Sequence, residues 1–160
     1  MDIRYILIKK IFFLLIVLIG FIACSKSTPS VFNGDSLYKK GLEYTQIGNI
    51  VSKLETKAII NATYLNRSDP KLYNNNYQNF LVGIYNIDEN KNYKLTLNNK
   101  DINSSIKIDK KDEIYNNIPL KNPHANYYIV SFSKVKDETT LNLIYTHPIY
   151  GKVTLPFVAE

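Results

Sequence analysis

The sequence predicts an all-β domain, an immunoglobulin-like antiparallel β-sandwich of about seven strands. Apolar and polar residues alternate with a period of two over most of the chain after Thr56, as they do in half-buried strands. Turns rich in asparagine and aspartate separate these segments about every ten residues, which is the spacing typical of a sandwich. The chain has one cysteine and no tryptophan, so an antibody-type core is excluded.

Residues 1–23 are predicted to be a signal peptide. The apolar run at residues 11–23 follows the positive residues Arg4, Lys9 and Lys10, which form the flank that stays on the cytoplasmic side. The run is shorter than the roughly 20 residues that a membrane-spanning helix needs, but it is long enough for the apolar core of a secretory signal.

The end of this segment, Phe-Ile-Ala-Cys at residues 21–24, resembles the lipobox of bacterial lipoproteins, although Phe21 stands where the family usually has leucine. The resemblance implies that Cys24 receives a diacylglycerol and that a peptidase cuts before it, next to the small Ala23. Ser25 resembles the residue found there in outer-membrane lipoproteins of Gram-negative bacteria. An ordinary signal peptide with a chance cysteine, or a short membrane anchor, is the alternative.

Fatty-acyl chains such as palmitate on Cys24 would anchor the protein, because each buried methylene contributes about 0.8 kcal/mol and two or three chains together bind durably. Residues 24–34 are polar and are predicted to form a tether between this anchor and a single domain at residues 35–160. The domain is expected to begin with a helix of about two turns, since Asp35 and Ser36 are good N-caps.

The predicted strands occupy residues 57–66, 78–88, 92–99, 104–109 and 126–135, with a hairpin at 139–158. The second of these is apolar on both faces and is expected to be central. Pro156 cannot donate to a ladder, so the last strand is expected at an edge or with a bulge. The residues expected to face the core are Ala58, Ile60, Ala62, Tyr64, Tyr93, Leu95, Leu97, Tyr128, Val130, Phe132, Leu141, Leu143, Tyr145, Val153, Leu155 and Phe157.

These strand patterns, taken with the lipobox, resemble small immunoglobulin-like lipoproteins of Campylobacter and its relatives. The resemblance covers most of residues 45–160. It implies a fold and a location in the cell envelope, but no mechanism, because its motifs are strand patterns rather than catalytic signatures.

The composition argues against nucleic-acid binding. The formal net charge is +6, but arginine occurs only at Arg4 and Arg67, and the lysines are scattered among asparagine and aspartate instead of clustering on one element. No cofactor is expected from any motif.

Metal binding and catalysis are not expected either. His124 and His147 each adjoin a proline in a predicted turn and are interpreted as surface residues without convergent ligands. Residues 86–92 carry Asn86, Asp88, Asn90 and Asn92 at alternate positions, but the central glycine and the final glutamate of a calcium loop are missing, which favours a polar hairpin turn. No nucleophile elbow or phosphate loop is present in the sequence.

Residues 101–105, Asp-Ile-Asn-Ser-Ser, match the extended acceptor sequon of Campylobacter-type N-glycosylation and make Asn103 a candidate acceptor. Asn61 and Asn66 lie in simple sequons that lack the acidic residue. Asn103 is expected in a turn that links two strands, where a bulky glycan could be accommodated.

The chain has 13 tyrosines and 7 phenylalanines, and several of them alternate with polar residues and are interpreted as core residues or cross-strand pairs. Tyr127 and Tyr128 must point to opposite faces, so one of them is expected to be exposed. Together these patterns predict a lipid-anchored, non-catalytic binding or adhesion module of the envelope that contacts a protein or a glycan. The alternatives are a periplasmic assembly accessory and a cryptic hydrolase that uses His124 or His147.

Overall fold

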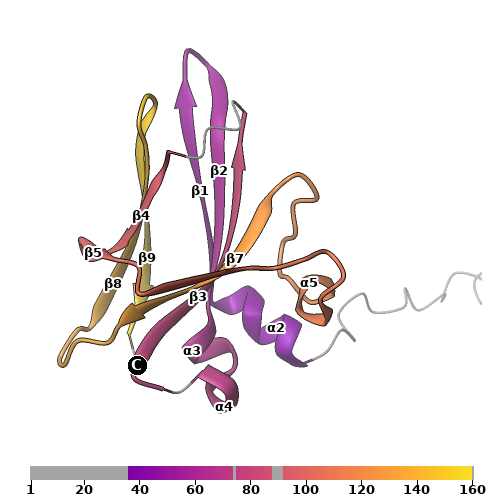
Figure 1. Cartoon of the computed structure of the whole chain (residues 1–160), viewed down its shortest axis with the longest axis vertical. Coiled ribbons are helices and arrows are strands. Elements are labelled where there is room, and N and C mark those ends of the chain that lie inside the picture. The colour runs from indigo at the N-terminus through magenta and orange to yellow at the C-terminus, as the bar shows by residue number, and fades with distance from the viewer. Residues whose placement is uncertain (1–35, 74, 88–91, 160) are drawn as a thin grey trace, which may run out of the picture. The chain divides into compact units, whose positions relative to one another are not determined.

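The structure is a computed structural model that describes residues 36–73, 75–87 and 92–159. In this part of the chain nine strands form two antiparallel sheets (Figure 1). The five-stranded sheet has the order β1-β2-β3-β7-β6, made by Thr45–Ser52, Glu55–Tyr64, Tyr77–Asn86, Asn126–Ser133 and Ser104–Lys107. The four-stranded sheet has the order β5-β4-β8-β9, made by Lys100–Asp101, Lys94–Leu97, Thr140–His147 and Gly151–Val158. The predicted all-β class is confirmed, while its immunoglobulin-like subclass stays a prediction.

The main core lies between the two sheets and contains the residues that the alternation predicted. Tyr64 stacks on Phe80 with ring centroids 5.0 Å apart, and Phe157 packs edge-on against Phe80 at 5.2 Å. These rings join β2 and β3 of one sheet to β9 of the other, so the aromatic residues cross-link the layers by packing. β3 is buried along most of its length, as predicted for a central strand.

β9 is an edge strand, as Pro156 predicted. Pro156 pairs with Asn142 in the β8–β9 ladder. Its missing N–H would point to the open side of β9, so the ladder loses no hydrogen bond. The short helix at the start of the domain is also confirmed, as α2 (Ser36–Glu43).

The sequence did not predict β1. Its core face carries Gln46, Gly48 and Ile50, of which only the last is a large apolar residue, so the alternation is too weak to read. The glycine has a structural reason. A Cβ at Gly48 would lie 2.5 Å from Cγ2 of Val153 and 2.8 Å from Cδ2 of Leu155, so only glycine lets β9 pack this closely beneath the edge.

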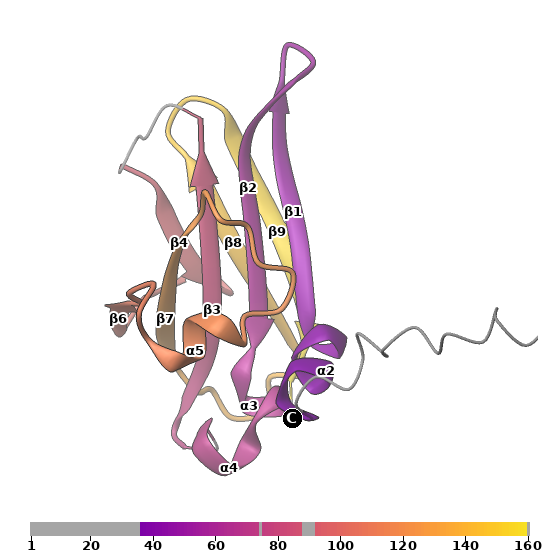
Figure 2. The ribbon, with the colours of Figure 1, turned by 90° about the vertical axis from the view of Figure 1, so that its right-hand side faces the viewer.

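The outer face of the five-stranded sheet is covered over much of its area, which the sequence reading did not anticipate. Asn61 and Thr63 lie on the face of β2 that points away from the main core, and both are buried. Figure 2 shows α2, α3 (Leu65–Ser68) and α5 (Glu113–Asn116) over this face, with α4 (Pro70–Tyr73) following α3. A second apolar cluster forms beneath them from Leu65, Leu81, Ile108, Ile118, Ala125 and Tyr127.

This cover also corrects the expectation for the tyrosine pair. Tyr127 lies in the second cluster and Tyr128 packs half-buried against the main core, so neither side chain is exposed. The two residues do point to opposite faces, but both faces of the sheet are occupied at this position.

Candidate functional site

The predicted signal peptide, the tether and the lipidation position Cys24 lie outside the described residues. Within residues 36–73, 75–87 and 92–159, no helix combines the length and the apolar character that crossing a bilayer requires.

The three sequons differ sharply in accessibility. Asn66 is fully buried; its Nδ2 donates to the carbonyl oxygens of Tyr73 and Tyr77, both at 2.8 Å, and its Oδ1 accepts the backbone N–H of Asn79 at 2.7 Å. Asn61 is buried as well, and its Nδ2 donates to the carbonyl oxygens of Pro119 and Leu120. Both amides hold loops against the sheet, so neither is available for modification in the folded protein.

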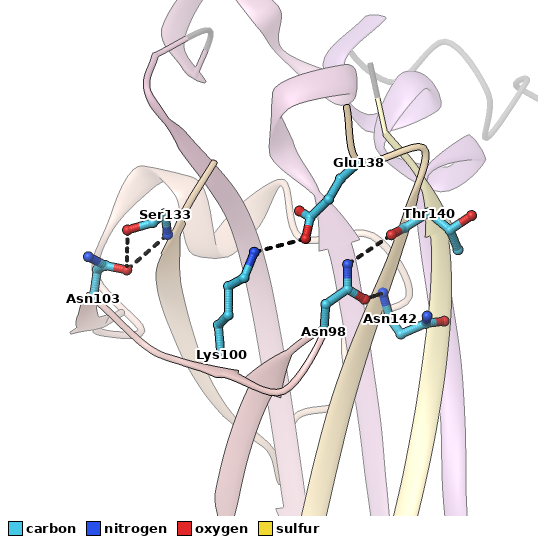
Figure 3. Close-up of polar contacts among 7 residues, drawn as sticks. All are labelled: Asn98, Lys100, Asn103, Ser133, Glu138, Thr140 and Asn142. Atoms are coloured by element: carbon cyan, nitrogen blue, oxygen red, sulfur yellow. Dashed lines mark hydrogen bonds and ion pairs between the residues drawn. The ribbon is translucent and has the colours of Figure 1, made fainter. Parts of the chain in front are cut away.

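Asn103 lies in the link between β5 and β6 and is exposed, as predicted. Its Oδ1 accepts the backbone N–H of Ser133 at 2.9 Å and the Ser133 hydroxyl at 3.1 Å (Figure 3). No bond from its Nδ2 to another described residue is found, and Figure 3 shows this nitrogen turned away from Ser133. The nucleophilic atom of the sequon is thus open while the carbonyl side of the amide is fixed.

The expectation of two surface turn histidines is wrong for His147. This residue ends β8 and is buried. Its Nδ1 accepts the backbone N–H groups of Ile149 at 3.2 Å and Tyr150 at 3.3 Å. Its ring stacks on that of Tyr150 with centroids 4.7 Å apart. His147 therefore organises the β8–β9 turn from inside. His124 is exposed in a turn, as expected.

In the described part of the chain, no group of three or more His, Cys, Asp or Glu side chains converges. Of the residues that resembled a calcium loop, Asp88 and Asn90 lie outside the described residues. The Oδ1 of Asn86 accepts a hydrogen bond from the hydroxyl of Tyr145 at 2.6 Å. This oxygen therefore binds a core tyrosine.

The perturbed tyrosines serve packing. Burial raises the pKa of the Tyr127 phenol, whose oxygen accepts the backbone N–H of Asn122 at 2.7 Å. Burial, together with the hydrogen bond and nearby phenol of Tyr128, also raises the pKa of Tyr93. Both phenols stay neutral at ordinary pH, so they are suited to structural hydrogen bonds rather than to proton transfer.

A surface pocket of about 440 Å³ lies where β6 and β7 meet the α5 segment, and its lining includes Lys107, Asp109, Lys110 and Tyr115. The Asp109 carboxylate is used locally, because it accepts the backbone N–H of Lys111 at 2.9 Å. The lining is completed by Ile108, Ala125, Asn126 and Tyr127, and among these described lining residues no nucleophile is paired with a base.

The clearest functional signal is the β1–β2 turn. Ser52 pairs with Glu55, so Lys53 and Leu54 alone make the turn, with φ values of 51° and 64°. Two-residue turns of this kind favour Asn-Gly because both positions need positive φ. Lys and Leu each disfavour that conformation by about 1–2 kcal/mol. Leu54 is moreover 100% exposed.

Three other exposed aliphatic residues lie at the same end of the sandwich, in or beside the β1–β2, β3–β4 and β8–β9 connections. We call this set the tip end; its members are Val51, Leu54, Ile87 and Ile149, which are 59%, 100%, 50% and 69% exposed. Figures 1 and 2 both show the β1–β2 and β8–β9 turns at the end of the molecule away from α3 and α4. Exposed apolar residues gathered in this way make the tip end a candidate interaction surface.

Contacts between the connections hold the tip end together. The Lys57 ammonium on β2 lies 5.6 Å from the centroid of the Tyr150 ring in the β8–β9 turn. The backbone N–H of Ile87 donates to the carbonyl of Lys57 at 3.0 Å. These contacts join the three connections to one another. His147 also holds the β8–β9 turn, because it accepts two of the turn's backbone N–H groups. A rigid frame that presents a few apolar residues is suited to binding.

Comparison of the chain with protein-family models, with curated protein sequences and with solved structures gave no match. The functional assignment therefore rests on the residues themselves. Sequence reasoning missed the tip end because Ser-Lys-Leu-Glu at residues 52–55 contains no glycine, proline, asparagine or aspartate, and so gives no turn signal.

Proposed function

We propose that this protein is a lipid-anchored component of the bacterial cell envelope, in the outer membrane, and that its β-domain is a non-catalytic binding module. The proposal rests on one observation above the others, the fully exposed Leu54 in a left-handed turn conformation. Neither hydration nor backbone preference favours a leucine at that position. Strained and exposed residues of this kind are typical of functional surfaces.

The arrangement of the chain supports binding at a distance from the anchor. α2 immediately precedes β1, and the Lys53–Leu54 turn follows the other end of that strand. Eight residues of strand rise about 26 Å, so the chain enters the domain about that far from the tip end. With Cys24 acylated and residues 24–34 acting as the tether, the tether would join the domain at the end of β1 opposite the tip end.

The chemistry of the tip end favours a protein partner over a glycan. Its members are aliphatic, and exposed Lys53 and Lys152 lie in the same two hairpins. Aliphatic residues gain from contact with apolar protein surface, whereas neighbouring lysines suit an acidic rim. The partner is therefore a protein with an apolar patch edged by carboxylates.

A photoreactive amino acid in place of Leu54 tests this in intact cells. We expect irradiation to join the variant to one discrete protein, with a yield at least tenfold above that of the same group in place of Leu72. Leu72 is a matched control because it is also an exposed leucine, 72% accessible, but lies in α4 away from the tip end. Equal yields at both positions, or no adduct at position 54, would contradict the proposal.

The mass of the purified native protein tests the anchor and the candidate glycan together. We expect a chain that starts at an acylated Cys24 and loses fatty-acid labelling in Cys24→Ala. Of the three sequons only Asn103 is exposed, so any glycan should disappear in Asn103→Gln and persist in Asn61→Gln. A chain that starts at Met1 with a free thiol would refute the anchor. A mass that Asn103→Gln changes only by the substitution itself would refute the acceptor.

A further inference from the structure

The edge strands of the two described sheets differ in how they are protected against pairing with a further strand. Among the described strands, β1, β6, β5 and β9 are the edges. Edge strands present unpaired backbone groups, and proteins protect them by shortness, charge or proline. β5 and β6 have only two and four residues, and they carry Lys100 and Lys107. β9 is longer but contains Lys152 and Pro156.

β1 has none of these protections along most of its length. Its eight residues, Thr-Gln-Ile-Gly-Asn-Ile-Val-Ser, contain no charge and no proline. The register shift between Ile50 and Val51 interrupts the ladder only near the turn. The strand from Thr45 to Ile50 is therefore regular, neutral and open along one side, and Figure 2 shows no other strand of the same sheet beyond it.

The ladder identifies which backbone groups are open. The backbone N–H of Tyr64 donates to the carbonyl of Tyr44 at 2.9 Å, so this pair bonds across the two strands. Bonded pairs alternate in an antiparallel ladder, which directs Gln46 and Gly48 toward β2. Thr45, Ile47 and Asn49 consequently direct their N–H and C=O groups away from it, and no further backbone partner for the latter two is found among the described residues.

The side chains fit the same interpretation. Ile47 is 50% exposed and Val51 59% exposed on the outer face of the sheet, where apolar side chains gain from a neighbouring strand. On the core face, Gly48 is in close contact with β9, so the sandwich already ends beneath this strand. An added strand would extend the sheet without displacing any element of the domain.

We propose that β1 is a pairing edge at which a second copy of this chain binds, antiparallel, so that two five-stranded sheets become one of ten strands. A symmetric pairing about Ile47 sets Thr45 of each copy opposite Asn49 of the other and brings the two Ile47 side chains into contact. The chain has a net charge of +6, which opposes self-association elsewhere, but the paired strands are neutral. The other edges would each bring a lysine to the contact.

Thiol cross-linking of the full-length chain tests the proposal. In Ile47→Cys, symmetric pairing places the two new thiols within reach of a disulfide, because paired Cα atoms lie about 5.5 Å apart. We expect mild oxidation to give a covalent dimer in at least tenfold higher yield than in Lys152→Cys, the matched control on edge β9. The unsubstituted chain, with Cys24 in place, sets the background. Equal dimer yields, no dimer, or a disulfide to a different protein would overturn the proposal.

A second variant separates pairing from chance collision. Asn49→Pro removes an N–H that β2 does not use, and it should lower the dimer yield of Ile47→Cys at least tenfold while leaving the cooperative unfolding transition in place. Ile47→Lys serves the same purpose where proline perturbs the fold, since it sets two like charges opposite each other; native-mass analysis should then show a monomer. A dimer that survives in both variants contradicts pairing through β1.

Discussion

Two hairpin turns of this domain share one backbone conformation and differ completely in chemistry. The β1–β2 turn uses Lys53 and Leu54, and the β4–β5 turn uses Asn98 and Asn99, with φ values of 47° and 66°. Asparagine is among the residues that most readily adopt positive φ, whereas lysine and leucine are not. The second turn is thus made of residues that suit its shape, and the first is not.

The surroundings of the two turns differ as well. The Asn98 side chain donates to the carbonyl of Thr140 at 2.9 Å and accepts the backbone N–H of Asn142 at 2.8 Å (Figure 3). It continues the sheet where β4 ends. Leu54 is fully exposed to water. Stability explains the residues of the β4–β5 turn, so the residues of the β1–β2 turn require a different explanation, and binding supplies one.

The largest effect is expected from Asn98→Ala, which should lower the free energy of unfolding by about 2–3 kcal/mol. The substitution leaves two backbone groups of β8 without their partner and puts an alanine at positive φ. Urea denaturation measures the loss. Asn99→Ala is the matched control, because it has a similar φ but an exposed side chain, and it should lose only about 1 kcal/mol. Equal losses would show that Asn98 contributes conformation alone.

The reverse exchange at the other turn should stabilise the domain. Replacing Lys53 by asparagine and Leu54 by glycine lowers the conformational cost of positive φ at both positions. The double substitution should raise the free energy of unfolding by about 1 kcal/mol. The same double variant should no longer capture the proposed partner, as competition against the wild-type protein would reveal. A double variant that is no more stable, or one that binds as well as the wild type, would remove the contrast between the turns.

Much of the sandwich could be predicted because most of its strands have one apolar face. β4, β8 and β9 follow the alternation, and Leu95, Leu143 and Leu155 lie in the core as expected. Period-two patterns identify the face that a strand buries in the main core. They give no information on whether another element covers the opposite face.

The failures have that physical origin. Asn61 on β2 alternates like a solvent-facing residue, but it is buried because a distant loop places two carbonyl groups over it. His147 adjoins a proline and reads as a turn residue, yet it lies inside the turn and accepts the turn's N–H groups. A long-range contact decides the first case, and contacts inside the turn itself decide the second. The exposure of Asn103 was predictable because it depends on a local turn.

The smallest expected effect concerns the ion pair beside the asparagine turn, which separates stabilisation by charge from stabilisation by shape. The Lys100 ammonium lies 2.9 Å from the Glu138 carboxylate. Burial raises the pKa of Glu138, but the hydrogen bonds from Lys100 and Asn98 and the lysine charge outweigh it, so the pKa lies below its ordinary value of 4.5. A lowered carboxyl pKa contributes stability above the unfolded value, and this contribution is lost as pH falls through the folded value.

Lys100→Met should therefore lower the free energy of unfolding by less than about 1 kcal/mol at pH 7, since both partners are partly solvated. The difference from the wild type should shrink as pH falls below about 4.5 and should vanish below the lowered pKa of folded Glu138, because the carboxylate is then protonated in both proteins. Urea denaturation across this range measures it. Lys94→Met is the control, since its pair with Asp101 is 64% and 74% exposed and should show no such difference. A Lys100 effect that persists unchanged in acid would come from packing of the lysine stem against the turn, and the turn would then owe its stability to asparagine hydrogen bonds and shape alone.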